Sequence, residues 1–232
     1  MLDRAQASLY HWPETARVER PVPKGKFYAH GKVTSTVHER FVGEVQRITW
    51  AYKLAETTIN LVGSVAVPEI QVFRIHAKHD DVSDVVLSAI DKAVKSVIIF
   101  EVHRGDGHAG RTRMVAAHKQ LGPAAPKPSA YFTTGWLADD SERVPLPAAI
   151  NLPSLYAALL APLLPVAIHP GEDAAAVATR VERARKMERE VAALQKQIRN
   201  EPQFNRKVEL HRALRTRQAT LTDLTSPNHP RT

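Results

Sequence analysis

The sequence predicts an α/β (α+β) protein with a mixed four- to five-stranded sheet, a βαβ unit and a C-terminal antiparallel helical hairpin that forms a coiled coil. Two observations support this prediction. Two strongly apolar runs, at residues 69–77 and 97–102, flank an amphipathic helical segment, and strand, helix and strand over about 35 residues is the pattern of a βαβ unit with parallel strands. From Asp173 onward apolar residues recur at heptad spacing, which is typical of helices paired along a seam.

The composition sets limits on the class of protein. Apolar residues make up 44% and charged residues 24% of the 232 residues, so the chain can bury a core without covalent staples. The absence of cysteine excludes a disulfide scaffold and thiolate chemistry, and it fits a reducing compartment. An early acid, Asp3, and the lack of an apolar core at the N-terminus predict no signal peptide and a cytoplasmic protein. Four prolines interrupt the apolar stretch of residues 146–168, which predicts a buried helix and no membrane span.

The net charge of +8 is concentrated near the C-terminus. Residues 180–217 contain twelve Lys or Arg against five Glu, whereas the rest of the chain has 20 basic and 19 acidic residues. A solvated coiled-coil surface accounts for charged positions in general, but not for an excess of seven positive charges. This excess predicts contact with phosphate backbones, an anionic surface or an acidic protein partner.

The N-terminal part is predicted to be an extended arm followed by a helix. Residues 1–36 contain three prolines that bracket a basic patch, so we expect an extended arm. Thr36 and Glu39 have the spacing of a capping box. The apolar residues that follow fall at helical spacing and predict one helix that ends near Leu54. They are Val37, Phe41, Val45, Ile48 and Tyr52.

The α/β domain is placed at residues 37–170. After the first helix we expect these elements in order: a strand at 57–67, a central strand at 69–77, a helix from Ser83, a central strand at 97–102, a glycine-rich loop at 104–110, a strand at 111–118, a short strand at 130–137 and an apolar helix at 152–164. Pro170 and Gly171 mark the boundary to the next segment.

The C-terminal segment, residues 171–225, is predicted to be the helical hairpin. Val177, Ala184, Val191 and Ile198 are seven residues apart, and Arg180 is the one polar interruption of this seam. Residues 200–203 should form the turn between two antiparallel helices. Residues 226–232 are predicted to be a disordered tail.

A search for catalytic motifs assigns no catalytic residue, no cofactor and no metal. Histidines and acids follow the two central strands, where α/β proteins usually bind ligands, and such a set could hold zinc or iron. No pair has the His-x-x-x-His spacing of a helical metal site, so solvated loop residues are the simpler interpretation. Glu69 and Glu101 do not form the acid pattern of a magnesium-dependent nuclease. No phosphate-binding glycine loop and no nucleophile elbow is present. The histidine and acid positions are His76, His79, Asp80, His103, Asp106 and His108.

Basic residues are the candidates for contact with nucleic acid. On the strand that begins at residue 111, basic side chains could line a groove or remain a solvated face; these are Arg111, Arg113 and Lys119. On the hairpin, the predicted phosphate contacts are Arg183, Lys186, Arg189, Arg206, Lys207, Arg212 and Arg215. Binding through such contacts weakens steeply with salt.

Several short motifs resemble a bacterial family known as domain of unknown function 4391. They are Val22-Pro23-Lys24; Phe41…Val45-x-x-Ile48-x-Trp50-x-x-Lys53-Leu54-x-x-x-Thr58-Ile59-Asn60; Glu69-Ile70-x-Val72; Ala117-His118-Lys119; Thr134-x-Trp136; and Phe204-Asn205-Arg206-Lys207-Val208-Glu209-Leu210. The resemblance covers most of the chain, and none of its motifs is a catalytic signature. His211, where the family pattern has Asn, and the polar loop from Gly105 depart from it.

The resemblance implies an accessory role. Members of this family tend to be encoded beside helicases and DNA methyltransferases of restriction-like or anti-phage defence systems. We therefore expect a non-catalytic accessory subunit of a DNA-targeting complex, with the α/β domain on a helicase or methyltransferase and the hairpin on DNA or on the same partner. Two alternatives remain open: a divergent metal-dependent nuclease or other hydrolase that uses Glu69, Glu101 and the histidines, and a homodimeric scaffold held by the helical seam without nucleic acid.

Overall fold

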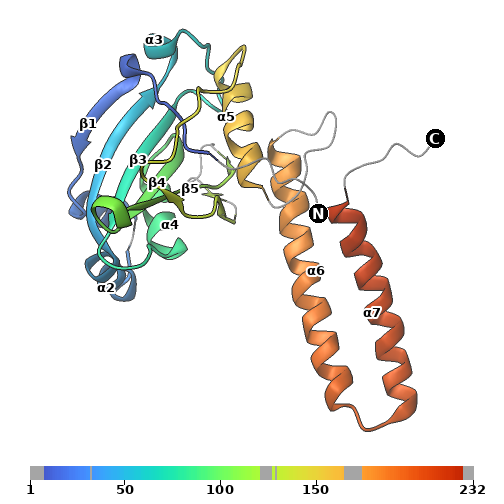
Figure 1. Ribbon diagram of the computed structural model, residues 1–232. Coiled ribbons are helices and arrows are strands. Elements are labelled where there is room, and N and C mark those ends of the chain that lie inside the picture. Colours follow the sequence, from blue (N-terminus) through green and yellow to red (C-terminus); the bar gives the residue numbers. More distant parts are fainter. Residues whose placement is uncertain (1–7, 32, 121–126, 129, 165–173, 227–232) are drawn as a thin grey trace. The chain divides into compact units, whose positions relative to one another are not determined.

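The computed structural model describes residues 8–31, 33–120, 127–128, 130–164 and 174–226. The chain divides into two compact units, Met1–Leu164 and Pro165–Thr232. The first unit contains the sheet and its helices, and the second contains the helical hairpin (Figure 1). The predicted domain boundary at Pro170 and Gly171 lies outside the described residues. So does the predicted disordered tail at 226–232, except for Ser226.

The first unit is built on a mixed seven-stranded sheet. Its strands run in the order β1-β2-β3-β4-β5-β8, and β9 also pairs with β5. Strands β3 and β4 are parallel, and the other pairs are antiparallel. The strands are β1 (Arg17–Pro21), β2 (Val45–Leu54), β3 (Ile70–Ala77), β4 (Val97–Arg104), β5 (Arg111–Ala116), β8 (Phe132–Thr133) and β9 (Leu137–Ala138). A separate short pair joins β6 (Lys119–Gln120) to β7 (Lys127–Pro128).

Helix α4 (Asp84–Ala93) connects the two parallel strands, which confirms the predicted βαβ unit and the mixed α/β class. The apolar runs on β3 and β4 become strands because Val, Ile and Phe suit a surface that is buried on both sides. The remaining helical segments of the unit are η1 (Glu14–Ala16), α1 (Gly25–Gly31), α2 (Ser35–Glu44), α3 (Glu56–Ile59), η2 (Gly107–Ala109), α5 (Leu152–Leu160) and η3 (Ala161–Leu163).

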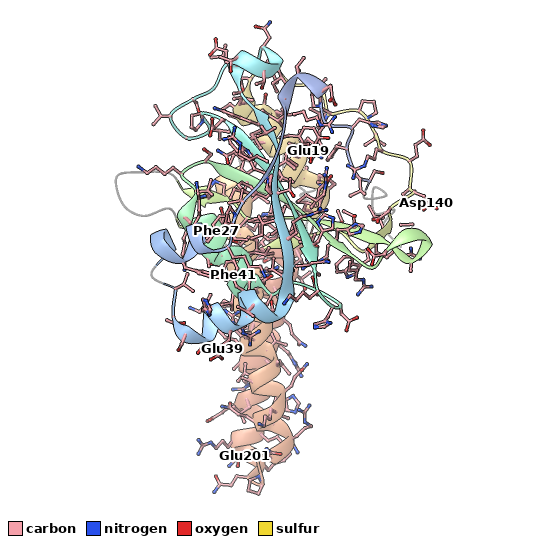
Figure 2. All side chains as sticks on the ribbon, turned by 90° about the vertical axis from the view of Figure 1, so that its left-hand side faces the viewer. Glu19, Phe27, Glu39, Phe41, Asp140 and Glu201 are labelled. Carbon is pink, nitrogen blue, oxygen red and sulfur yellow. The ribbon has the colours of Figure 1, made fainter. Side chains whose placement is uncertain are left out.

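The two faces of the sheet differ in chemistry. On one face, Phe73, Ile75 and Phe100 share a buried core with side chains of α2 and α4. Phe27 of α1 and Phe41 of α2 stack in this core with their ring centroids 6.3 Å apart (Figure 2). Because side chains alternate along a strand, the residues between these apolar positions on β3 and β4 point to the opposite face.

The predicted single helix to Leu54 is wrong. Helix α2 ends at Glu44, with Thr34 as its N-cap, and the chain continues directly into β2. The register of β2 against β3 shifts twice, between Val45 and Arg47 and between Trp50 and Tyr52. Each shift places buried residues three positions apart instead of two. The buried residues of this bulged strand therefore have nearly the spacing of a helix, which is why the sequence pattern predicts a helix.

Two further segments correct the predicted elements. The arm expected at residues 1–36 contains η1, β1 and α1, and β1 pairs with β2. The strand expected at residues 57–67 begins as α3, a single helical turn. The backbone N–H of Ala55 donates to the hydroxyl of Thr58, and Asn60 closes the turn with φ 54°.

The second unit is an antiparallel hairpin of α6 (Ala174–Asn200) and α7 (Phe204–Thr225), as predicted (Figure 1). Val177, Ala184 and Ile198 of the seam are buried in α6, and the two helices pack against each other within one chain. An ion pair between Arg217 and Glu190, 3.0 Å long, joins the helices. No helix among the described residues is both long and apolar enough to cross a membrane.

Candidate functional site

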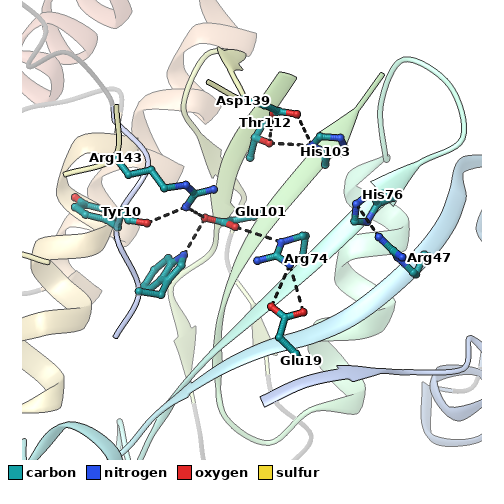
Figure 3. Close-up of polar contacts among 11 residues, drawn as sticks. Tyr10, Glu19, Arg47, Arg74, His76, Glu101, His103, Thr112, Asp139 and Arg143 are labelled. Atoms are coloured by element: carbon teal, nitrogen blue, oxygen red, sulfur yellow. Dashed lines mark hydrogen bonds and ion pairs between the residues drawn. The ribbon is translucent and has the colours of Figure 1, made fainter. Parts of the chain in front are cut away.

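A strip of polar side chains crosses the sheet face opposite α4. It begins from the register of the parallel strands, which pairs Arg74 of β3 with Glu101 of β4 and His76 with His103. The alternation of each strand therefore brings all four side chains to one face (Figure 3). The histidines stand at the carboxyl ends of the parallel strands, the usual location of ligand sites in α/β sheets.

The first row of the strip is organised around Glu101, whose side chain is 1% exposed. Its Oε1 accepts hydrogen bonds from Trp12 Nε1 at 2.8 Å and from Arg143 Nη1 at 2.7 Å. Arg74 Nε lies 3.8 Å from Oε2, and Arg74 Nη1 donates to Glu19 at 3.1 Å. Two arginines thus face two carboxylates, so the row is neutral overall and a buried charge is compensated.

This row ties distant segments to the sheet. The same Nη1 atom of Arg143 also donates to the carbonyl oxygen of Tyr10 at 2.8 Å, and Tyr10 forms a β-bridge with Val144. The chain around Trp12 and the chain around Arg143 are therefore both fixed on Glu101. This arrangement is a structural clamp.

The second row contains His103, Thr112 and Asp139. His103 Nδ1 lies 3.0 Å from Asp139 Oδ2 and 3.2 Å from Thr112 Oγ1. The Thr112 hydroxyl donates to Asp139 Oδ1 at 2.7 Å, so it accepts from His103. The proton of the neutral ring therefore sits on Nδ1, and Nε2 is left as the acceptor.

His76 continues the second row towards β2. Arg47 Nη2 lies 3.1 Å from His76 Nε2, and because a guanidinium always donates, Nε2 accepts and Nδ1 carries the proton. Burial, and then the charges of Arg47 and His103, lower the pKa of His76 to about 4. The buried Nδ1 atom has no hydrogen-bond partner among the described residues, and the ring centroid lies 4.9 Å from that of His103.

The second row resembles the arrangement of a general base in one respect. His103 is oriented by a carboxylate, and an imidazole held in this way can accept a proton on Nε2. The groups do not make a metal centre: within the described part of the chain, no three or more His, Cys, Asp or Glu side chains are grouped closely enough to hold an ion.

The acids of the nuclease alternative are not brought together. Glu69 precedes β3 and bonds to Lys53, Gln71 and Ser96. Glu101 pairs with Arg74, five residues further along that strand, which corresponds to about 16 Å of extended chain.

Lys119 and Arg113 do not line a basic groove, which corrects that expectation. The ammonium of Lys119 is fully buried and donates to the carbonyl oxygens of Asp91, Val94 and Ser96. The guanidinium of Arg113 donates to Asp81 Oδ1 through Nε and Nη2 and lies over the Trp136 ring. Arg111 is half-buried and donates to the carbonyl oxygen of Gly110.

The basic candidates on the hairpin are accessible. All of them are exposed except Lys207, which is half-buried. Arg206 forms an ion pair with Glu201 at 3.4 Å. For five of them the described residues provide no hydrogen bond or ion pair to the side chain, namely Arg183, Lys186, Arg189, Arg212 and Arg215.

Sequence reasoning missed most of the strip. Arg74 and His76 interrupt an apolar strand at alternate positions, which is a visible signal, and His76 is one of the candidate histidines. Trp12, Arg143 and Asp139 carry no signal, because they reach the strip from loops. Trp12 and Glu101, for example, are 89 residues apart in the sequence.

Comparisons with known proteins identify one relationship. A family model described as "Domain of unknown function (DUF4391)" matches residues 11–221. The match extends over the sheet with its polar strip and over most of the hairpin. No curated protein and no solved structure matches the chain.

Proposed function

The chain belongs to the DUF4391 family, and from this premise we propose that it is a non-catalytic accessory subunit of a DNA-targeting complex whose hairpin binds nucleic-acid phosphates. The observation that carries the proposal is the set of five exposed cations on α6 and α7 that have no carboxylate partner among the described residues. Lys and Arg side chains that are not paired within the protein keep their full charge for an external anion.

The arrangement of these cations favours a phosphate backbone over a small anion. At 100° per residue, Lys186 and Arg189 lie on the side of α6 that is turned away from its seam, and Arg183 flanks the seam. Arg212 and Arg215 lie on the outer side of α7. Positive charges spread along a rod suit a ligand whose negative charges are also spread along a line.

The protein partner is part of the same proposal. We propose that the α/β unit docks on a helicase or DNA methyltransferase subunit of a restriction-like, anti-phage defence system. The resemblance to the family supports this part. The buried seam supports a role for the hairpin other than self-association, because α7 already covers α6 within one chain.

The test compares two sets of substitutions on the same hairpin. In the first set, Arg183, Lys186, Arg189, Arg212 and Arg215 are replaced by Gln. In the control set, Arg206 and Arg217, which are paired with Glu201 and Glu190, are replaced by Gln. Binding to a fluorescent duplex and to a fluorescent single strand is measured by anisotropy over a series of salt concentrations.

We expect the first set to weaken binding and to flatten its salt dependence by about 0.9 in log–log slope for each phosphate that is no longer neutralised. The control set should have a smaller effect, because its cations are already neutralised. Absence of salt-dependent binding by the unmodified protein, or equal effects of the two sets, would refute the DNA role. Purification of the native complex from its cells tests the partner: a helicase or methyltransferase is expected in it.

A further inference from the structure

The first residue of α7 is an aromatic side chain that the hairpin does not use. Phe204 is 78% exposed, and Val208, one turn further along, is 36% exposed. Exposure of an aromatic ring to water is unfavourable, by about 2 kcal/mol for a Phe side chain relative to burial. Aromatic residues are enriched at interfaces relative to the rest of the protein surface.

Phe204 shares one face of α7 with unpaired cations. Successive helical residues turn by 100°, so Val208, Arg212 and Arg215 lie within about 80° of Phe204 around the axis. Arg212 and Arg215 are about 12 Å and 16 Å from Phe204 along the axis. Both arginine side chains are exposed, and neither has a carboxylate partner among the described residues.

We propose that this face binds single-stranded nucleic acid, with a base stacked on the Phe204 ring and phosphates on Arg212 and Arg215. The inference rests on the proposed function and specifies the form of the ligand. Aromatic rings combined with cations that follow the backbone are the means by which proteins hold single strands without sequence preference. In a duplex, the faces of the bases are already stacked on each other, so a surface phenyl ring has no base face to contact.

Other occupants fit the face less well. A second copy of the chain would bring Arg212 and Arg215 against identical charges, which is unfavourable. An apolar protein helix would need apolar side chains at successive turns, but beyond Val208 the next positions of this face are His211, Arg212 and Arg215. Neither acid of α7 lies on this face: Glu209 is about 140° and Asp223 about 100° from Phe204 around the axis.

The experiment separates stacking from charge. The probes are fluorescent oligothymidylate of about 15 nucleotides, close to the upper site size of single-strand binding domains, and a duplex of the same length. Phe204→Ala is compared with Val208→Ala, which removes apolar surface from the same face without removing a ring. Phe204→Trp conserves the aromatic face. Circular dichroism establishes that each variant retains its helices, which is expected because both positions are exposed.

We expect Phe204→Ala to weaken binding of oligothymidylate about tenfold or more and to change duplex binding by no more than about twofold. Phe204→Trp should retain affinity for the single strand. Tryptophan fluorescence of Phe204→Trp, after subtraction of the signal of the unmodified protein, should be quenched by oligothymidylate. The inference is overturned if Phe204→Ala affects both probes equally or neither of them. It is also overturned if Val208→Ala matches its effect. Salt-dependent binding of either probe that persists in these cases leaves the proposed function intact, whereas the absence of salt-dependent binding to both probes refutes both proposals.

Discussion

The ammonium of Lys119 lies 2.8 Å from a carboxylate oxygen of Asp91, in a position where the two side chains are only 0% and 2% exposed. The Tyr131 hydroxyl donates to the other carboxylate oxygen at 2.8 Å. Burial raises the pKa of Asp91 and lowers the pKa of Lys119. Each charge is therefore tolerated in the core because the other is present, and Lys119 also binds the last carbonyl groups of α4.

Replacement of Lys119 should therefore destabilise the first unit strongly. We expect Lys119→Met to lower the free energy of unfolding by about 3–5 kcal/mol, because Asp91 and three carbonyl groups then have no cation to bind in the protein interior. Urea denaturation followed by circular dichroism measures it. Lys92→Met, at an exposed position of α4, serves as control, with an expected change in the free energy of unfolding below about 0.5 kcal/mol. Equal stability of the two variants would contradict the role of the pair.

Glu101 should contribute more to the stability of the first unit than Glu19, the other carboxylate of its row. We expect Glu101→Gln to cost about 2–4 kcal/mol, because it leaves Arg143 and Arg74 without the buried charge between them. Glu19→Gln, whose side chain is 30% exposed, should cost less than about 1 kcal/mol. In Glu101→Gln, Trp12 should also be less firmly held, which is observable as a red shift of tryptophan emission. A cost for Glu19→Gln as large as that for Glu101→Gln would be inconsistent with the clamp.

His76 should make the stability of the first unit depend on pH. Its pKa is about 4 in the folded protein and 6.5 in a model peptide, so between these values the unfolded chain binds more protons. Stability therefore rises from about pH 4 to pH 6.5 and is lost as the pH falls through this window. The contribution is about 1–2 kcal/mol, because the ring is partly screened by solvent.

The pH dependence is tested with His76→Gln. Its amide oxygen can still accept from Arg47 but does not titrate, so the difference in unfolding free energy between pH 6.5 and pH 4 should shrink. His211→Gln, at an exposed position of the hairpin, is the matched control. A pH profile of His76→Gln identical to that of the unmodified protein would show that His76 is not the group responsible.

Arg180 should hold the end of α7. Its side chain, in the buried seam, donates from Nη1 to the carbonyl oxygen of Leu224 at 2.9 Å. A cation at the C-terminus of a helix also interacts favourably with the helix dipole. We expect Arg180→Met to accelerate amide hydrogen exchange at residues 218–225 while overall stability changes by about 1 kcal/mol or less, because Met fills the seam. Unchanged exchange in that segment would exclude the proposed tether.

The elements that could be predicted from the sequence are those whose signal is local. β3, β4 and α4 are defined by apolar runs and by one amphipathic segment, and the hairpin by its heptads. β2 could not be predicted, because its two bulges moved the buried residues to helical spacing. β1 could not be predicted either, because its pairing with β2 depends on contacts between Arg17 and Tyr52, which are distant in sequence.

The candidate site residues also divide into those that could be predicted from local sequence and those that depend on distant contacts. Cations on an exposed helix are visible in the sequence, since helical spacing alone keeps them on the surface. The burial of Lys119 was not visible, because it depends on the position of Asp91 on α4, 28 residues away. The clamp around Glu101 likewise depends on loops whose position follows from the complete sheet.

The edge strand β1 has a consequence for how the molecule behaves in a crowded solution. A regular strand at a sheet edge offers a ladder of free backbone groups on which another molecule can add a strand. In β1, Glu19 adopts φ 47°, the register shifts between Arg17 and Arg20, and Pro21 has no N–H to donate. Two charged side chains of this short strand, Arg17 and Arg20, are exposed as well. Growth of the sheet from this edge into fibrous aggregates is therefore disfavoured by the irregular backbone itself.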